Sequence, residues 1–544
     1  MHSKFQPLLS ACLLSTLAFG QQPTQNILAN GGFESGLMCF STNIWNTVNA
    51  PFASDYKFSL TKDSHSGANA LEITCLTKLC EKAAIISSKI QTSGAQPYVL
   101  SVYSKCPAGR SAAVYVPGTQ GGDTFVNLSC NGNWTPNTIK FTTGKAARDF
   151  FFYIYNRDVE WLRLDDIVLT FADHSVPAAN IRHAGLRDVS ISGSTLSVDG
   201  NPYFALGFFD VPYDALQQVA DLGANTINGL GYSFPASCSN TGQPNYLDRA
   251  YELNLNFLPD SSSSARLASP DAMTAAARQF GAHLANIGWY LSDEPDQERV
   301  PAWFLGPEVL TAVYRAVHAQ LAIPVLSTFQ HAAWSVPADA VPYAPGTDIY
   351  MAEPYGPEFS GINTAINTFN SLDKAKPIWL AQDDPDAALI VPKAYWATIS
   401  GATGILYFTW DAFKGAPAKL AAVTQVFAEL NQLKPVIFAT PIDSQVTPPD
   451  GIRVMARSLE DSQYILAANP KAATIPGTFT VSGLAAGTVV QVMFEDRTIT
   501  AAAGSFEDTF TGVSRHVYFI APTPTAKNKM RRSPIAPPAK AKRR

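Results

Sequence analysis

The segment Ile287-Gly-Trp-Tyr-Leu-Ser-Asp-Glu-Pro-Asp296 joins a short apolar run directly to an acidic turn. A short apolar run of this kind is typical of a strand that is buried on both faces of a parallel sheet. Polar groups that follow such a strand lie at the edge of the sheet where α/β enzymes bind their ligands. The segment therefore predicts a buried strand that carries Asp293 and Glu294 at its carboxyl end.

Similar apolar runs recur along the middle of the chain, and helix-length segments such as 213–222, 270–285, 308–320 and 393–400 separate them. Together with the segment above, the runs begin at Tyr203, Thr226, Leu255, Ile287, Val325, Ile349, Ile378 and Ile405. Eight strand–helix repeats predict a (β/α)8 TIM barrel over 186–435. A doubly wound open sheet is the main alternative, but no Gly-rich phosphate-binding turn follows the first run.

Both flanking regions have the alternating pattern of antiparallel sheets. Region 24–173 consists of short β-type runs broken by Gly, Asn, Ser and Pro, and region 436–522 repeats this pattern on a smaller scale. Each predicts a β-sandwich. The final segment, 523–544, is rich in Pro, Ala, Lys and Arg and predicts a disordered basic tail. The fold class is therefore multidomain, with a jelly-roll β-sandwich, a TIM barrel and a C-terminal β-sandwich.

The composition limits the kinds of partner. A chain of 544 residues is too long for one ordinary core. Charged residues make up 15% and the net charge is −5, so nothing indicates a nucleic-acid partner, and a neutral substrate fits better. No run after the N-terminus approaches the roughly 18 to 20 apolar residues of a membrane span. We expect a soluble protein without a membrane anchor.

The N-terminus predicts secretion. Lys4 precedes a mostly apolar stretch, 8–19, which indicates a signal peptide at 1–20. Six cysteines follow it, an even number that suits disulfides in an oxidising compartment: Cys39, Cys75, Cys80, Cys106, Cys130 and Cys238. A zinc site is the alternative, but paired C-x-x-C spacing and a nearby His cluster are missing. Sequons at Asn127 and Asn133 predict glycosylation, and we expect an extracellular or cell-wall protein.

Polar and aromatic residues follow several of the predicted strands. Glycoside hydrolysis requires two carboxyl groups, one protonated donor and one base or nucleophile, and these strand ends offer several pairs. The candidate catalytic residues are Glu294, Glu353 and Asp383. The candidate substrate contacts are Asp293, Trp289, His331, Tyr355, Gln382 and Trp410. Simpler interpretations exist: a helix N-terminal carboxylate for Glu294, a loop salt bridge for Glu353 and a helix cap for Asp383.

Five segments together resemble the clan A-like (β/α)8-barrel glycoside hydrolases: Val198–Phe204, Gly288–Pro295, Asp348–Tyr355, Lys376–Gln382 and Gly401–Trp410. The resemblance implies that Glu294, in an Asp-Glu-Pro turn after strand four, is the acid/base. It also places a nucleophilic Glu at the end of strand seven, where this chain has Gln382. Because an amide cannot act as a nucleophile in the same way, three possibilities stay open. Glu353 supplies the second carboxylate as nucleophile or base, Asp383 supplies it, or the barrel binds sugar without cleaving it.

The ends of the first region, Leu28–Gly36 and Trp161–Leu169, resemble those of jelly-roll carbohydrate-binding modules. The resemblance implies a possible structural calcium near Asp165 or Asp166, and no cofactor is expected for catalysis. Aromatic residues that would stack on sugars, or else belong to the core, are Trp45, Tyr103 and Trp134. The whole predicts a secreted hydrolase that cleaves a neutral polysaccharide or oligosaccharide by a two-carboxylate mechanism. The alternative is a non-catalytic carbohydrate-binding or cell-wall-associated protein with a barrel scaffold.

Overall fold

The structure is a computed structural model of the whole chain. It describes residues 26–44, 56–76, 83–157, 159–176, 182–229, 238, 246–262, 269–297, 304–330, 334–373, 375–384 and 386–522. Two compact units result: Met1–Asn180 with Pro235–Asn245, and Ile181–Phe234 with Tyr246–Arg544. The predicted signal peptide, the predicted basic tail, Trp45 and His331 lie outside the described residues. The finer domain boundaries stay predictions.

The first unit contains two antiparallel sheets of five strands each. In order across the first sheet they are β1 (Phe40–Ile44), β4 (Ala83–Ser87), β11 (Tyr153–Asn156), β7 (Ala112–Thr119) and β8 (Gly122–Leu128). Across the second they are β2 (Tyr56–Thr61), β3 (Ala70–Cys75), β12 (Trp161–Phe171), β6 (Pro97–Lys105) and β9 (Thr135–Thr142). A short pair, β5 (Ile90–Gln91) and β10 (Asp149–Phe150), completes the unit.

Alternation of buried and exposed side chains explains why these strands pack as two layers. Leu100 and Val102 on β6, and Leu162 and Leu164 on β12, are fully buried, whereas the residues between the members of each pair, Ser101 and Arg163, are partly exposed. The expected β-sandwich is confirmed. Disulfides join Cys39 to Cys238 and Cys106 to Cys130, as predicted for cysteines in an oxidising compartment.

The second unit is built on a sheet of eight parallel strands. They are β16 (Ala205–Phe209), β17 (Thr226–Asn228), β18 (Asn256–Leu258), β19 (Trp289–Asp293), β20 (Val325–Phe329), β21 (Ile349–Ala352), β22 (Ile378–Gln382) and β23 (Gly404–Tyr407). The first strand, β16, pairs with the last, β23, and parallel bridges such as Asp260 to Tyr290 link β18 to β19. This closes the sheet into the predicted barrel.

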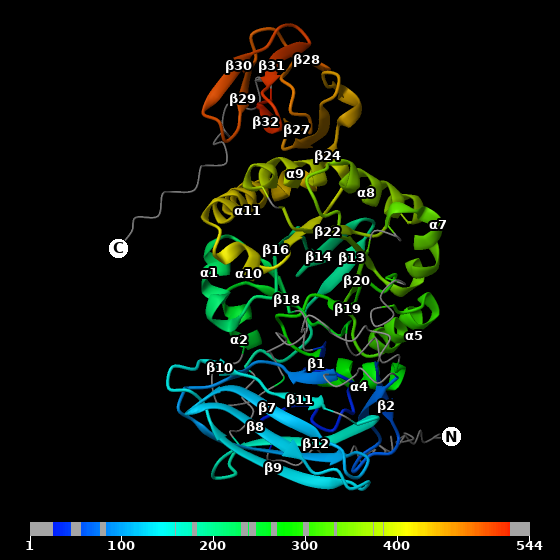
Figure 1. Cartoon of the computed structure of the whole chain (residues 1–544). Helices are drawn as coiled ribbons and strands as arrows, with labels where there is room; N and C mark the ends of the chain where they lie inside the picture. The colour runs from blue at the N-terminus through cyan, green and yellow to red at the C-terminus, as the bar shows by residue number, and fades with distance from the viewer. Residues whose placement is uncertain are drawn as a thin grey trace, which may run out of the picture. The chain divides into compact units, whose positions relative to one another are not determined.

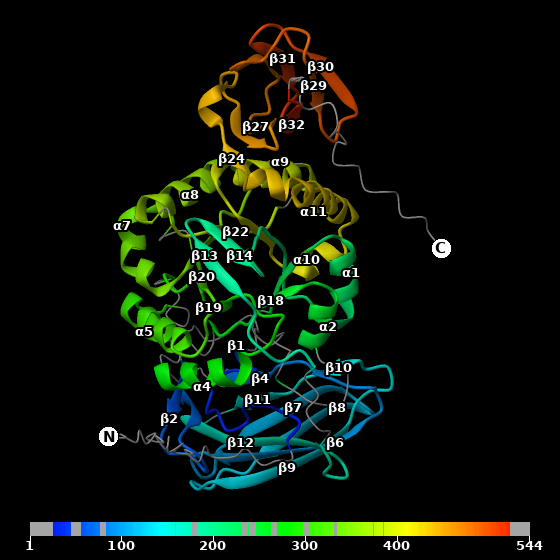
Figure 2. The same cartoon turned by 180° about the vertical axis from the view of Figure 1, so that it is seen from behind.

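Helices surround the strands, as Figure 1 shows from one side and Figure 2 from the other. They are α1 (Leu216–Asp221), α2 (Tyr246–Glu252), α4 (Pro270–Phe280), α5 (Pro307–His318), α7 (Pro337–Ala340), α8 (Ser360–Leu372), α9 (Ala387–Ser400), α10 (Trp410–Lys414) and α11 (Pro417–Ile437). None of the described helices is long and apolar enough to cross a membrane. One sequence boundary was wrong: Trp410 does not end the eighth strand but begins α10.

Every second side chain of each barrel strand points to the interior. Tyr290, Leu326, Met351, Trp379 and Leu406 belong to this inner core. A three-stranded sheet of β13 (Val189–Ser192), β14 (Thr195–Val198) and β15 (Asn201–Pro202) packs its apolar side chains into the same core. Counting every second residue from these inner-core side chains identifies, for each strand, which residue at its carboxyl end faces the barrel mouth.

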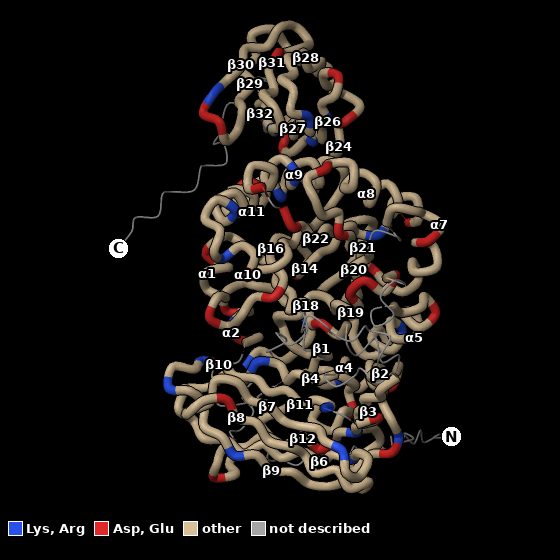
Figure 3. Tube along the Cα trace, viewed as in Figure 1, with Lys and Arg blue, Asp and Glu red and all other residues tan. Residues whose placement is uncertain are grey.

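Charged residues of both signs are interspersed along the described chain, as Figure 3 shows.

After α11 the chain enters a second sandwich-like pair of sheets. The larger consists of β24 (Thr440–Pro441), β26 (Arg453–Leu459), β27 (Ser462–Asn469), β32 (Ser514–Ile520), β29 (Val489–Val492) and β30 (Arg497–Thr500). The smaller consists of β25 (Val446–Thr447), β28 (Ile475–Val481) and β31 (Ser505–Phe510).

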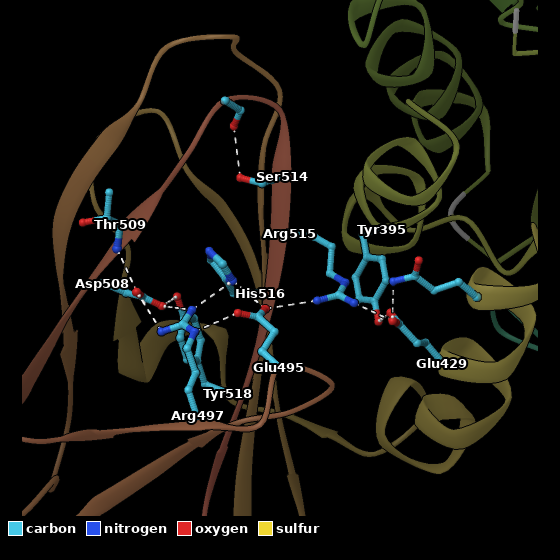
Figure 4. A network of polar contacts seen from close by, with 12 residues as sticks. Tyr395, Glu429, Glu495, Arg497, Asp508, Thr509, Ser514, Arg515, His516 and Tyr518 are labelled. Carbon is cyan, nitrogen blue, oxygen red and sulfur yellow. Dashed lines mark hydrogen bonds and ion pairs between the residues drawn. The ribbon is translucent and has the colours of Figure 1, made fainter. Parts of the chain in front are cut away.

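A polar network joins these sheets to the barrel helices (Figure 4). Arg515 on β32 forms ion pairs with Glu429 of α11 and, at 3.1 Å, with Glu495. The Tyr395 hydroxyl of α9 donates to Glu429 at 2.6 Å. Arg515 and Glu429 are less than a tenth exposed. Breaking such a buried pair leaves an uncompensated charge, so we expect substitution of either Arg515 or Glu429 alone to be destabilising.

Candidate active site

A shift of register at the end of β19 brings Asp293 into the barrel mouth. Tyr290 pairs with Leu326, and both are inner-core residues, but after the shift Asp293 pairs with Thr328. Thr328 lies two residues beyond Leu326 and so faces the same side. The Tyr290 hydroxyl is 2.7 Å from Asp293 Oδ1 and 2.7 Å from the Thr328 hydroxyl. Asp293 is therefore an inward carboxylate held by its own strand.

Glu294 follows in an unusual backbone conformation. Its φ of 44° lies in the left-handed region, which residues other than Gly rarely adopt. Its N–H donates to the Thr328 carbonyl at 2.9 Å, so β20 holds this turn in place. The turn brings the Glu294 carboxyl beside that of Glu353, whose pKa it raises.

Glu353 directly follows β21, whose inner-core residues are Ile349 and Met351. Alternation turns Glu353 inward as well. Both the Glu294 carboxyl and the Tyr355 hydroxyl interact with its carboxyl. Burial, together with the charges of Asp293 and Glu294, raises the pKa of Glu353 well above its ordinary value. Three carboxyl groups thus converge, and their proximity favours the protonated form of Glu353.

Aromatic side chains lie beside these carboxyl groups. Tyr355 is 40% exposed, and its ring centroid is 6.1 Å from that of Phe408, which is 5.8 Å from Phe209. Burial and the Glu353 carboxylate raise the pKa of Tyr355, so its hydroxyl stays a donor. Sequence reasoning missed Tyr290, Phe209 and Phe408. The signal was inward alternation counted from Leu406, which marks Phe408; Trp410 has the same parity but begins α10, where the alternation of the strand no longer applies.

The end of β22 is arranged differently. Gln382 pairs with Tyr407, whose ring contacts Phe413 of α10 and Phe427 of α11. These two residues therefore face the helices, and Gln382 is 3% exposed. Asp384 also faces this layer and forms an ion pair with Lys393 of α9. Asp383, partly exposed, is the next inward position after Trp379 and Ala381.

Three predicted substrate contacts do not reach the carboxyl groups. Gln382 faces the helices, for the reason given above. Trp289 is fully buried and donates from its indole N–H to Ser261 at 2.7 Å. Trp410 is 2% exposed and packs against Phe208. The strand or helix positions of all three turn their side chains away from the barrel interior, and their role as substrate contacts stays a prediction. Asp293, Glu294, Glu353 and Tyr355 are brought together.

In the first unit, Asp165 is buried and accepts N–H groups of His65 at 2.7 Å and Ser66 at 3.1 Å. Burial raises the pKa of Asp165 to about 6. Among the described residues no group of three or more His, Cys, Asp or Glu is arranged to hold a metal ion. Backbone N–H groups thus already bind the Asp165 carboxylate. A structural calcium near Asp165 or Asp166 stays a prediction.

The sugar-stacking candidates of the second sheet are engaged by neighbours. The Tyr103 ring stacks on His65 with centroids 3.6 Å apart, and the Trp134 indole donates to Asp63 at 3.3 Å. The first sheet carries a different aromatic set. Tyr153 and Tyr115 are register partners with centroids 5.8 Å apart, and Phe125 pairs with Tyr115 on the next strand. We call this set, together with Tyr155, the aromatic face.

No protein-family model and no curated protein matches the chain. Solved structures do resemble it. An Anoxybacillus alpha-amylase is 12% identical, with 57% of this chain and 90% of that chain covered, at a TM-score of 0.40. A GH30 endoxylanase of Clostridium papyrosolvens is 14% identical, with 62% and 100% covered, at 0.38.

A third solved structure spans more of the chain. The CBM22-1–GH10 modules of a Clostridium thermocellum endo-1,4-beta-D-xylanase are 10% identical, with 74% of this chain and 97% of that chain covered, at a TM-score of 0.33. These three neighbours are glycoside hydrolases. Identities and TM-scores this low carry no assignment of substrate or reaction, which must rest on the site.

Proposed function

We propose that the protein hydrolyses glycosidic bonds of a neutral polysaccharide or oligosaccharide, with Glu294 and Glu353 as the catalytic pair. The supporting observation is the proximity of these two carboxyl groups at the mouth of the barrel, where the pKa of Glu353 is raised. Glycoside hydrolysis needs one protonated and one ionised carboxyl group at the same bond. A pair that shares one proton supplies both forms at neutral pH.

The raised pKa of Glu353 supports this residue as the proton donor to the leaving oxygen. Glu294 is then the carboxylate that faces the anomeric carbon. This exchanges the two roles that the resemblance implies from sequence. After donation, the Tyr355 hydroxyl stabilises the Glu353 carboxylate through its hydrogen bond. Asp293, beside the pair, binds a sugar hydroxyl and keeps the pKa of Glu353 high.

The distance between the two carboxyl groups also bears on stereochemistry. Retaining enzymes hold their carboxyl groups about 5 to 5.5 Å apart, and inverting enzymes about 6.5 to 9.5 Å, because inversion needs room for a water. NMR of the first product formed identifies its anomer and so decides between retention and inversion.

The test compares the wild type with Glu294→Gln and Glu353→Gln on a panel of neutral polysaccharides, with release of reducing sugar as the readout. Loss of hydrolysis in both variants, with binding retained, supports the assignment. Full hydrolysis of every cleaved glycan by Glu294→Gln would sink it. Binding by the wild type without any release of reducing sugar would instead favour a non-catalytic carbohydrate-binding protein.

We further propose that the protein is secreted and that the aromatic face of the first unit binds the polysaccharide. Phe125 is 46% exposed, and its ring centroid is 5.9 Å from that of Tyr155. Rings in a row on a sheet offer flat apolar surfaces to sugar rings. The two disulfides and the signal-like N-terminus support an oxidising, extracellular setting.

A further inference from the structure

Behind the strand ends lies a buried ion pair that the proposed reaction does not use. Lys393 of α9 and Asp384, just after β22, pair through Nζ and Oδ1, and each side chain is 1% exposed. Taking two charges out of water costs several kcal/mol for each ion, and their attraction repays this only with good geometry and further hydrogen bonds. The other contact of the lysine is therefore informative.

Lys393 Nζ also donates to the carbonyl oxygen of Gly356 at 2.7 Å. Gly356 has a φ of 94°, in the left-handed region, and it follows Tyr355. The Tyr355 N–H donates to the Glu353 carbonyl at 2.7 Å. The turn 353–356 is thus closed at its start by its own backbone and held at its end by Lys393. This same turn presents the Glu353 carboxyl and the Tyr355 hydroxyl.

We infer that Lys393 is a positioning residue for Glu353 and Tyr355, and that Asp384 supplies the charge which allows the lysine to be buried there. The catalytic meaning of this inference rests on the proposed function. Lys393 touches none of the reacting groups and acts only through the turn. An ammonium group has three donors, so it can bind a carbonyl and a carboxylate at once. Its place on a 14-residue helix makes the anchor rigid.

The consequence concerns the proton of Glu353. The titratable groups around this carboxyl are Tyr290 and Asp293 on β19, Glu294 directly after β19, and Tyr355 in its own turn. Asp260, after β18, lies in turn near Tyr290. A held turn keeps the partly buried Glu353 against the two acidic neighbours. A released turn exposes the carboxyl to water and separates it from them, so its titration moves to lower pH.

The experiment uses the full chain with Lys393→Met and with the double variant K393M/D384N. The double variant removes the anchor without leaving Asp384 charged and unpaired. Difference infrared spectroscopy follows the protonated-carboxyl band that is absent in Glu353→Gln. We expect its midpoint, and the alkaline limb of kcat, to move about one pH unit or more to lower pH. We expect kcat to fall about tenfold or more while KM stays within about twofold.

The matched control is Arg515→Met, which removes the cation of another buried ion pair in the same unit (Figure 4). It lowers the thermal midpoint but leaves the infrared titration of Glu353 at the wild-type position. An unchanged titration in K393M/D384N would overturn the inference and leave Lys393 a purely structural residue. If the wild type cleaves no glycan, the proposed function fails, and the infrared titration still decides the positioning role.

Discussion

The ends of β21 and β22 look alike in sequence and differ in the structure. Each is an apolar run followed by acidic residues, Glu353 in one case and Asp383 and Asp384 in the other. Glu353 points into the barrel mouth, where burial and two carboxylates raise its pKa. Asp384 points toward the helices and is neutralised by Lys393. The direction in which a strand presents its last residues decides whether an acid is available for chemistry or for packing.

This comparison also explains the amide at position 382. Gln382 is aligned in register with Tyr407 and faces the helix layer. A carboxylate there would lie close to Asp384 and away from Glu294. The second carboxyl group must therefore come from another strand, and β21 provides it.

The largest expected effect is a difference in activity between variants at the end of β21 and variants at the end of β22. Glu353→Gln removes the proposed proton donor and lowers kcat by about 10² to 10⁴, whereas Asp383→Asn stays within about tenfold of the wild type. Initial rates on the best cleaved glycan measure both. The double variant E353Q/Q382E stays as inactive as Glu353→Gln, because residue 382 faces the helices. An equal loss in Asp383→Asn would make Asp383 the second carboxylate.

The next effect is a difference in stability between variants at the same two strand ends. Asp384→Asn leaves the Lys393 ammonium group buried without its carboxylate, and we expect a loss of about 3 to 5 kcal/mol in the free energy of unfolding. Glu353→Gln removes a crowded carboxyl group and is not destabilising at neutral pH. Urea unfolding followed by tryptophan fluorescence compares the two variants. Equal stability of Asp384→Asn and the wild type would contradict the structural role of Asp384.

A third prediction uses pH. The pKa of Glu353 is higher in the folded protein than in the unfolded chain. Its stabilising contribution is therefore fully present below the unfolded pKa and is lost as pH rises through the folded one. We expect a loss of about 1.4 kcal/mol for each pH unit between the two values. Unfolding measured across this window shows the slope in the wild type, and Glu353→Gln lacks it. Parallel curves for the two proteins would refute the raised pKa.

The smallest expected effect is on polysaccharide binding and compares the two sheets of the first unit. Aromatic side chains are exposed on one sheet and covered by neighbours on the other. Tyr155→Ala on the aromatic face is expected to weaken polysaccharide binding by about 1 kcal/mol. Tyr103→Ala, on the other sheet and covered by His65, is the matched control and leaves binding unchanged. Affinity electrophoresis in gels that contain the polysaccharide measures both. A greater loss in Tyr103→Ala would move the binding face to the second sheet.

The sequence by itself determined the order of the eight barrel strands, both flanking β regions and the value of Glu294 and Glu353 as candidates. Apolar runs and the acids that follow them are local patterns, and local patterns survive folding. Disulfide bonding followed in the same way from an even number of cysteines, and among the described residues it joins Cys39 to Cys238 and Cys106 to Cys130.

Only the tertiary structure decided which side chain at each strand end faces inward. The register shift on β19 turns Asp293 into the barrel, and α9 supplies the lysine that takes up Asp384. Trp410, which the sequence places at a strand end, begins a helix and packs outward. A one-residue change of register reverses every side chain beyond it, and a charge is paired by whichever residue the fold brings near. Both depend on neighbours far away in the chain, so no local pattern records them.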